Sequence, residues 1–441
     1  MNDFQNDAHK KVPKSRLARL AKLGGLAGKL STQALVNSGR NWIQGKPNQW
    51  SDWILNPKAM KEVVEQLATL RGAAMKLGQM MAMDAGVILP PQLSELFARL
   101  QNQGYTMPPA QLEKVLTANW GPSWRNQFQQ FDDTPFAAAS IGQVHRAITN
   151  NGQELAIKIQ YPGVADSIDS DLDNVTSLLR MARLLPPELD IDPLLDEARA
   201  QLKHEVDYHR EGEYTAKFHT IVEQTPNLAH FRVPQWFPDY STHALLATEY
   251  VYSQSLEAYL TANPDKVNSC FQALFEWLVA EFMEHRMVQT DPNTANYRVD
   301  DHGKIVLLDF GGTREYSSEF VGHYRAVIQA AMKNDRDALS DGLATMGFAF
   351  TEQNRVILES IYTSIVSPLG SATPYNFGQC PLADELVAMG LDVRNDPTSW
   401  HTPPPEVIFL HRKVVGLYLM AKRFKASVDF SPIRQIYFSD V

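Results

Sequence analysis

The chain has 441 residues, of which 44% are hydrophobic and 21% are charged, as is typical of globular proteins. Its formal net charge of -9 argues against a nucleic-acid-binding protein, because such proteins usually carry a basic domain. The two cysteines, Cys270 and Cys380, lie far apart, so we expect neither a disulfide framework nor a cysteine-based metal site, in keeping with a reducing compartment.

The first 50 residues form a basic arm. Between Met1 and Lys46 there are nine Lys or Arg residues against two Asp. Residues 14–40 carry leucines at three- to four-residue spacing, which predicts an amphipathic basic helix. Such a helix could lie on an anionic lipid surface, or it could pack its leucines on the body of the protein. We see no signal peptide and no run of roughly 18 to 20 apolar residues, so we expect a cytoplasmic protein, either free or peripheral on the inner face of the cytoplasmic membrane.

Residues 56–83 predict a second helix. Within it Lys76 and Gln79 are three residues apart and therefore share a face. Gly72 and Gly78 leave this part of the helix nearly bare, so it could approach a surface closely. The pair could then bring one cation and one amide to a buried phosphate or acidic cluster; the alternative is a solvated pair on an ordinary helix.

The pattern changes near Phe131 from helical to strand-like. Two predicted strands, residues 135–147 and 154–160, are separated by a turn at residues 149–152. In the second strand Lys158 lies on the face opposite the apolar Leu155, Ile157 and Ile159. A loop of small residues, whose backbone N–H groups could approach phosphate oxygens, lies at the start of the first strand. It consists of Ala137, Ala138, Ala139 and Ser140.

Residues 164–224 predict long helices. Asp192 resembles an N-cap with Pro193 at the first helical position, opening a helix that we expect to continue through Glu211. In that helix Asp207 and Glu211 would share a face, while Glu205 would lie about 120° round from Glu211. One carboxylate could pair with Lys158; otherwise this is a charged, exposed helix.

Residues 243–251 predict a buried strand that leads into a connector. In a kinase fold this is the hinge, where backbone groups of Glu249 and Val251 would bind the adenine edge. A helix with an apolar side is predicted from Leu256 onwards, and the remainder of the chain beyond Phe310 is expected to be mainly helical.

The most informative stretch is residues 291–311. Asp291 and Asn296 have a D-x-x-x-x-N spacing, and a D-F-G begins at Asp309 after two short strand-like runs joined by a polar turn. A hairpin would place Asn296 and Asp309 at one edge of a sheet, where an amide and a carboxylate oxygen could hold a hard divalent cation. Asp291 would orient or deprotonate the nucleophile. This arrangement predicts a phosphoryl-transfer site.

Protein kinases lay their peptide substrates on a long segment after the D-F-G. Here a predicted helix begins near Ser317, only a few residues after Gly311, and no A-P-E follows. We therefore expect no platform for a peptide.

These motifs resemble, over most of the chain, the atypical kinase-like family called ABC1, aarF-domain or UbiB/COQ8 proteins. The Q-T-D-P form from Gln289 is most similar to the COQ8 branch. The motifs that carry the resemblance are K-x-G-Q at Lys76–Gln79, A-A-A-S-I-G-Q-V-H from Ala137, Lys158, E-x-D at Glu205–Asp207, Q-T-D-P-N-x-x-N at Gln289–Asn296 and D-F-G at Asp309.

The resemblance implies a role for each of these residues. Lys158 would contact the α- and β-phosphates of ATP and pair with Glu211. Asn296 and Asp309 would hold Mg²⁺ or Mn²⁺, and Asp291 would stand in the catalytic-base position.

The family also implies that Lys76 and Gln79 lie over the active site, tied to Glu205 or Asp309, in room that a peptide would need. The resemblance therefore favours the functional reading of that helix.

The implied fold is α+β, an atypical protein-kinase-like bilobal fold with a mostly helical C-lobe. The expected parts are a basic arm at residues 1–50, a helical KxGQ extension at 51–130, an N-lobe with a helical insertion at 131–252 and a C-lobe at 253–441.

The implied function is that of a Mg²⁺-dependent ATPase that supports ubiquinone biosynthesis at a membrane, with quinone-biosynthesis enzymes or intermediates as partners and a homodimer left open. Two alternatives stay open. One is a true kinase for a small molecule or protein, and the other is a nucleotide-gated scaffold that binds lipid or protein.

Overall fold

The computed structural model describes residues 106–181, 192–348, 352–381 and 404–439. The described chain forms two compact units, one of residues 106–210 and 237–250, the other of residues 211–236 and 251–439. The basic arm and the helix with Lys76 and Gln79 lie outside the described residues, so both expectations stay predictions.

The first unit is built on a five-stranded antiparallel sheet with the order β1-β3-β4-β6, in which β2 also pairs with β3. The predicted strand, turn and strand around residue 150 are confirmed as β3, a turn with Gly152 at a positive φ, and β4. The strands span Phe128–Phe131 (β1), Ala137–Ala138 (β2), Gly142–Thr149 (β3), Glu154–Gln160 (β4) and Leu245–Glu249 (β6).

Alternation along β4 decides how this sheet packs. Leu155, Ile157 and Ile159 are fully buried, while Lys158 points to the other face and is half-buried, as the period of two predicts. The apolar face is covered by helix α6 (Pro109–Trp120) and by the buried indole of Trp124. The covered face fixes the register of β4 and with it the position of Lys158.

The prediction of a single helix from Asp192 through Glu211 is wrong. Helix α8 begins at Asp192 but ends at Glu205, and α9 starts anew at Tyr208 (Asp192–Glu205 and Tyr208–Gln224). Between them Asp207 Oδ1 accepts hydrogen bonds from the backbone N–H groups of His209 and Arg210, at 3.1 and 3.2 Å. Asp207 therefore caps α9 and is not part of a continuous helical face. Helix α7 (Val164–Met181) packs on α8.

The second unit contains two small sheets. The larger has the order β5-β10-β9-β7, and the smaller pairs β8 with β11. A further two-stranded pair joins β12 and β13. The strands span Phe231–Arg232 (β5), Ser253–Ser255 (β7), Met287–Gln289 (β8), Tyr297–Asp300 (β9), Ile305–Leu307 (β10), Thr313–Glu315 (β11), Tyr375–Asn376 (β12) and Ser427–Val428 (β13).

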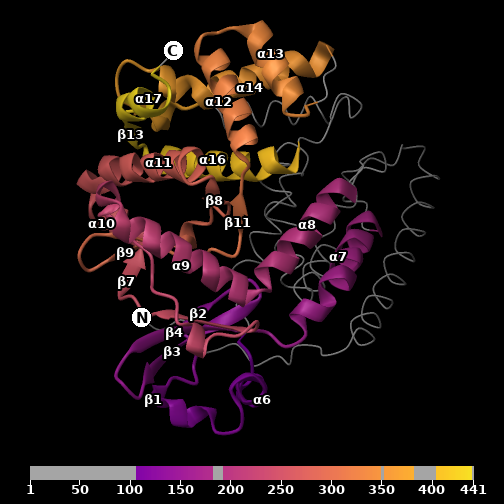
Figure 1. The fold of residues 1–441 in the computed structure, drawn as a ribbon, viewed down its shortest axis with the longest axis vertical. Coiled ribbons are helices and arrows are strands. Elements are labelled where there is room, and N and C mark those ends of the chain that lie inside the picture. The colour runs from indigo at the N-terminus through magenta and orange to yellow at the C-terminus, as the bar shows by residue number, and fades with distance from the viewer. Residues whose placement is uncertain (1–105, 182–191, 349–351, 382–403, 440–441) are drawn as a thin grey trace, which may run out of the picture. The chain divides into compact units, whose positions relative to one another are not determined.

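Helices make up most of the second unit, which confirms the expectation for the chain after Phe310. The apolar side predicted for α11 is buried, and α16 runs along this helix (Figure 1). The helices span Leu256–Ala262 (α10), Val267–Met283 (α11), Ser318–Met332 (α12), Arg336–Thr345 (α13), Glu352–Gly370 (α14), Pro405–Phe424 (α16) and Ser431–Tyr437 (α17).

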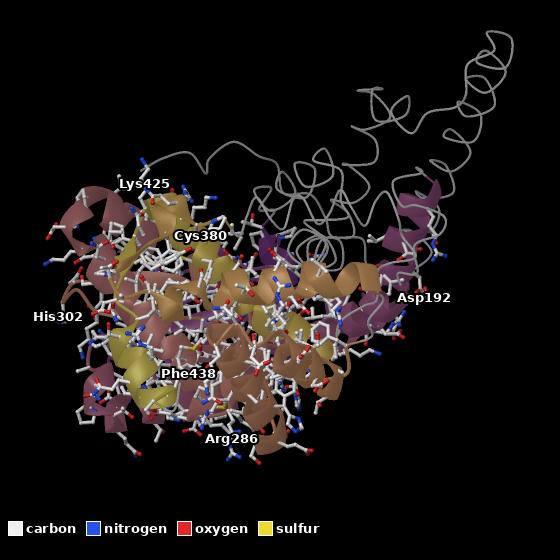
Figure 2. All side chains as sticks on the ribbon, turned by 90° about the horizontal axis from the view of Figure 1, so that it is seen from above. Asp192, Arg286, His302, Cys380, Lys425 and Phe438 are labelled. Atoms are coloured by element: carbon white, nitrogen blue, oxygen red, sulfur yellow. The ribbon has the colours of Figure 1, made fainter. Side chains whose placement is uncertain are left out.

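Cys270 and Cys380 are both buried and carry free thiols; Cys380 is labelled in Figure 2. Within the described part of the chain, every helix is too short or too polar to cross a membrane.

Candidate active site

The hairpin of β9 and β10 brings Asn296 and Asp309 to one edge of their sheet. Tyr297 and Leu307 are partners in the antiparallel register, and the next residue on each strand extends the pairing, since the N–H of Leu308 donates to the carbonyl of Asn296 at 2.9 Å. The turn between the strands holds Gly303 at a positive φ of 79°. The strand and turn pattern predicted for this stretch is confirmed.

Asp309 adopts a left-handed backbone conformation with φ 60°, which is uncommon for a residue that carries a Cβ. Its carbonyl accepts a hydrogen bond from Gln289 Nε2 at 3.0 Å, and the following Phe310 is buried and stacks on Phe218 at 4.7 Å. Strained residues of this kind persist when their surroundings hold them, and they concentrate at functional sites.

Glu211 lies on the same side of α9 as Phe218, two helical turns away, and its buried carboxylate stands beside Asp309. A Cβ added at Gly311 would lie 3.3 Å from Glu211 Oε2 and 3.5 Å from Asp309 Oδ1. Gly311 of the D-F-G therefore leaves room for two carboxylates in one small space. The expected pairing of Glu211 with Lys158 stays a prediction.

Asn296 ends a short 3-10 turn, Thr294–Asn296, which Asn293 caps by accepting from the N–H of Ala295 at 3.0 Å. Its Nδ2 donates to the carbonyl and to the carboxylate Oδ2 of Asp291, at 3.3 and 3.4 Å. Because the amide nitrogen faces Asp291, the amide oxygen faces another direction, where it could serve as a ligand.

Asn296 and Asp309 together offer hard oxygen donors, so they fit a divalent cation that also binds phosphate. Among the described residues no group of three or more His, Cys, Asp or Glu side chains could hold a metal by itself.

Asp291 itself is largely buried, with 15% of its side chain exposed. Its Oδ1 accepts from Nη2 of Arg412 at 3.1 Å, so the two carboxylate oxygens bind different donors. The guanidinium of Arg412 is fully buried. This arginine comes from α16, far along the chain, and our sequence analysis missed it.

In the first unit, Lys158 pairs in register with Val144 of β3 and Leu246 of β6. Its ammonium lies 5.0 Å from the ring centroid of Tyr208. The predicted loop is in part a strand, because Ala137 and Ala138 form β2 and pair with β3. The turn that follows closes tightly, since the N–H of Ala139 donates to the carbonyl of Gly142 at 2.9 Å. Glu249 ends β6 and Val251 follows two residues later, so a strand lies in the predicted place, while the role of both residues as a hinge stays a prediction.

Glu205 and Asp207, the acidic residues of the E-x-D motif, lie at the break between α8 and α9; a regulatory role for them stays a prediction. Glu205 is the last residue of α8, and Asp207 accepts from the ring Nδ1 of His243 as well as capping α9. Burial acts to raise the pKa of Asp207, but hydrogen bonds from the Arg210 backbone and from His243 outweigh it and lower the pKa. Asp207 is therefore held in its ionised form by local contacts.

Residues 99–342 match the ABC1 atypical kinase-like domain. The chain belongs to the ABC1 atypical kinase family. ABC1 proteins are kinase-like phosphoryl-transfer enzymes that bind ATP and use a divalent metal, so the kinase family and activity class inferred from the sequence are confirmed.

Two relatives resemble the chain over most of its length. It is 32% identical to the atypical kinase COQ8, mitochondrial, of Saccharomyces cerevisiae, over 95% of this chain and 83% of the relative. It is 34% identical to the atypical kinase coq-8, mitochondrial, of Caenorhabditis elegans, again over 95% of this chain, which spans only 56% of that protein.

A solved structure supports the ABC1 fold. The complex of Rv3197 with erythromycin from Mycobacterium tuberculosis aligns with a TM-score of 0.59 at 22% identity, over 86% of this chain and 96% of the other. Together with the helices and mainly antiparallel sheets described above, this confirms the kinase-like α+β fold.

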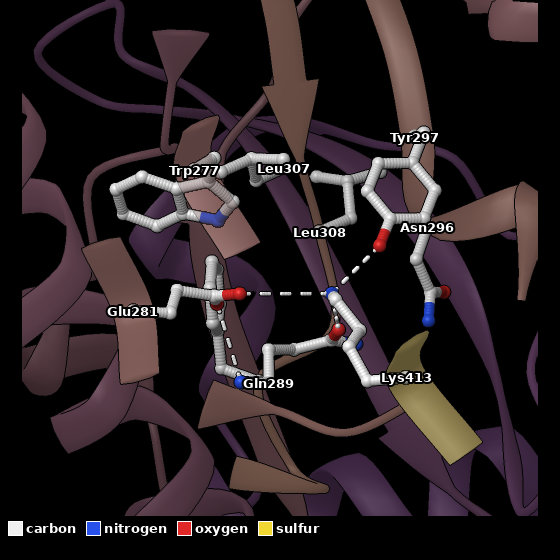
Figure 3. A pocket seen from close by; sticks show the side chains of 9 residues that line it. Trp277, Glu281, Gln289, Asn296, Tyr297, Leu307, Leu308 and Lys413 are labelled. Atoms are coloured by element: carbon white, nitrogen blue, oxygen red, sulfur yellow. Dashed lines mark hydrogen bonds and ion pairs between the residues drawn. The ribbon is translucent and has the colours of Figure 1, made fainter. Parts of the chain in front are cut away.

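A second group that the sequence analysis missed is centred on Lys413 of α16 (Figure 3). Lys413, next to Arg412, donates to Gln289 Oε1 at 2.8 Å and to the Tyr297 hydroxyl at 2.7 Å, with Glu281 Oε2 3.9 Å away. These side chains line a cavity of about 10 Å³, close to the space that one water needs. Burial raises the pKa of Glu281 to about 7 despite the nearby ammonium. The sequence did contain a sign of these residues, because Arg412 and Lys413 are adjacent cations within a mainly apolar stretch of α16.

Proposed function

We propose that this ABC1 protein is a Mg²⁺-dependent ATPase that supports ubiquinone biosynthesis at a membrane surface. The observation that carries the proposal is the shared edge of the β9 and β10 hairpin, where Asp291, Asn296 and Asp309 meet. Asn296 and Asp309 would hold Mg²⁺, which neutralises charge on phosphate oxygens when bound. Asp291 would orient or deprotonate the attacking water.

The other residues complete the proposed nucleotide site. Lys158 would contact the α- and β-phosphates, the loop at Ala137–Ser140 would line them, and the backbone of Glu249 and Val251 would bind adenine. Lys76 and Gln79 would cover the site, with Glu205 as one anchor for that cover.

The segment after the D-F-G supports water or a small molecule as the acceptor. Residues Thr313–Glu315 pair at once with β8, and Ser317 caps α12 by accepting from the N–H of Phe320 at 3.0 Å. Since only six residues separate Gly311 from the first residue of α12 at Ser318, counted from the sequence, no long segment is available on which a peptide could lie.

The link to ubiquinone rests on the COQ8 relatives and on the motifs shared with that branch. Both relatives are named mitochondrial. For this chain we propose a peripheral position on a membrane surface, with the basic arm of residues 1–50 as the contact and quinone-pathway enzymes or intermediates as partners.

The test is ATP turnover by the purified full chain, with and without anionic vesicles and a phenolic quinone precursor. We expect Mg²⁺-dependent release of phosphate that the vesicles and precursor increase. Transfer of labelled γ-phosphate to a discrete acceptor would instead identify a true kinase, and the lack of both nucleotide binding and turnover would refute the proposal.

The variant Asp291→Asn distinguishes an ATPase from a scaffold that must bind nucleotide but catalyses no reaction. If this variant binds ATP yet fails to restore quinone content in a quinone-deficient strain, chemistry is required. Full complementation by a variant that retains ATP binding would favour the scaffold.

A further inference from the structure

Helix α16 carries two adjacent cations into the interior of the second unit. Arg412 and Lys413 are both buried, although the neighbouring positions of the helix are mainly apolar. Burying a charge is costly unless partners compensate, and a buried ion pair is often no more stabilising than apolar residues of the same volume. Arg412 donates to Asp291 and Lys413 donates to Gln289, which indicates that these two cations serve the site more than the core.

Arg412 fixes the carboxylate of Asp291. Its Nη2 donates to Oδ1 at 3.1 Å, while Nδ2 of Asn296 lies 3.4 Å from Oδ2. Two donors on different oxygens define the plane of the carboxylate as well as its distance. Rotation of Asp291 about its last side-chain bond would break both contacts.

Lys413 fixes the amide of Gln289. A lysine ammonium can only donate, so Gln289 must present its Oε1 to Nζ, at 2.8 Å. The amide nitrogen is then turned toward the carbonyls of Asp291 and Asp309, each 3.0 Å away, which can only accept. Only one orientation of the amide satisfies all three contacts. In that orientation the Gln289 side chain joins the backbone of Asp291 to the strained backbone of Asp309.

Glu281 of α11 completes this support. Its Oε1 accepts from the backbone N–H of Gln289 at 3.2 Å, and its carboxylate is the nearby counter-charge of Lys413. Gln289 is therefore held through its main chain by one helix and through its side chain by another (Figure 3).

We propose that Arg412 and Lys413 are positioning residues for phosphoryl transfer, Arg412 by orienting the Asp291 carboxylate and Lys413 by orienting Gln289, which ties together the backbones of Asp291 and Asp309. The inference rests on the proposed function of Asp291. Both residues lie beyond residues 99–342, the range that matches the family domain.

The first test compares Arg412→Met with Arg412→Lys in the full-length chain, measuring kcat for ATP hydrolysis, the Kd for Mg²⁺-ADP and the thermal midpoint. Arg412→Met should lower kcat on the order of 10²-fold, because a misplaced catalytic group costs about that much. The Kd should change by less than about threefold, because Asp291, to which Arg412 donates, is not one of the proposed metal ligands. Arg412→Lys, which keeps a cation, should recover about tenfold of the lost rate.

The matched control is Arg434→Met. Arg434 of α17 donates to the carbonyls of Leu369 and Ser371, at 2.8 and 3.0 Å, so its loss removes partly buried contacts from residues other than those of the proposed site. Its kcat should stay within about twofold of the wild type even if the midpoint falls. An equal loss of kcat in both variants would overturn the inference.

Gln289→Glu tests the second part of the proposal, the orientation of Gln289 by Lys413. It also keeps the inference testable if Arg412→Met does not fold. It keeps the shape and the acceptor for Lys413 but turns a carboxylate oxygen toward two carbonyl oxygens. We expect kcat to fall at least about tenfold in a folded protein. If a folded Gln289→Glu or Arg412→Met variant has the kcat of the wild type, the positioning role is refuted and the proposed function stands. If the wild-type chain itself shows no ATP turnover, both the proposed function and this inference are refuted.

Discussion

The backbone N–H of Leu308 donates to the carbonyl of Asn296 at 2.9 Å, so these two residues close the end of the β9 and β10 hairpin. The bond is one step beyond the last paired strand residues, Tyr297 and Leu307. As a result Asn296 and Asp309 leave the hairpin side by side, although thirteen positions separate them in the sequence. A short, locally encoded hairpin is enough to assemble two oxygen donors.

Asp309→Asn tests this assembly. The variant keeps the size of the side chain but removes the negative charge of a proposed metal ligand, so the affinity for Mg²⁺-ADP should fall at least about tenfold. Calorimetric titration with Mg²⁺-ADP measures the change, and titration with ADP in the presence of EDTA is the control. An unchanged affinity for the metal complex would refute Asp309 as a ligand.

Gly311→Ala tests the crowding between Glu211 and Asp309. The added Cβ would stand 3.3 Å from Glu211 Oε2, which is tight, and 3.5 Å from Asp309 Oδ1, which is an ordinary contact, so the Glu211 carboxylate would have to shift by a few tenths of an ångström. We expect the affinity for Mg²⁺-ADP to fall about tenfold, since small displacements at a site are costly. The control is Gly322→Ala at an exposed position of helix α12, where a Cβ meets no atom within 4 Å and should add about 0.5–1 kcal/mol of stability. Wild-type affinity in Gly311→Ala would show that the carboxylates have room to adjust.

Asp207→Ala removes the cap of α9. The free energy of unfolding should fall by about 1 kcal/mol, because two backbone N–H groups lose their acceptor. Asp207→Ser, which can still accept, should recover most of this loss. Urea unfolding followed by circular dichroism makes the comparison, and equal midpoints for the alanine variant and the wild type would contradict the capping role.

The buried His411 should make the free energy of unfolding depend on pH. Burial lowers the pKa of this histidine to about 4 from its ordinary 6.5, and its Nε2 lies 2.9 Å from the Tyr324 hydroxyl. The neutral ring is thus favoured in the folded chain, while the unfolded chain takes up a proton below pH 6.5. The contribution of His411 is complete above pH 6.5 and is lost as the pH falls to about 4, by at most about 1.4 kcal/mol per pH unit.

His411→Gln, which cannot titrate, isolates this effect. The difference in unfolding free energy between wild type and variant should shrink from pH 7 to pH 5, as measured by urea unfolding at both values. Parallel pH profiles for the two proteins would mean that His411 is not buried in its neutral form.

The sequence predicted features that depend on near neighbours. The β9 and β10 hairpin, the two faces of β4 around Lys158 and the short link from Gly311 to α12 all follow from local periodicity and turn residues. The break at Asp207 was missed because the helical spacing on either side outweighed one capping residue. The contact of Arg412 with Asp291 joins residues 121 positions apart, which no local pattern encodes.

That separation also bears on how the protein is made. The proposed catalytic carboxylate at residue 291 leaves the ribosome long before its arginine partner at residue 412, so a growing chain carries the D-x-x-x-x-N and D-F-G motifs before it has the means to set their geometry. A product that stops at residue 342, where the family match ends, would hold every recognisable motif of this unit without the helix that orients them. Synthesis would thus deliver a complete site only after α16 has been made.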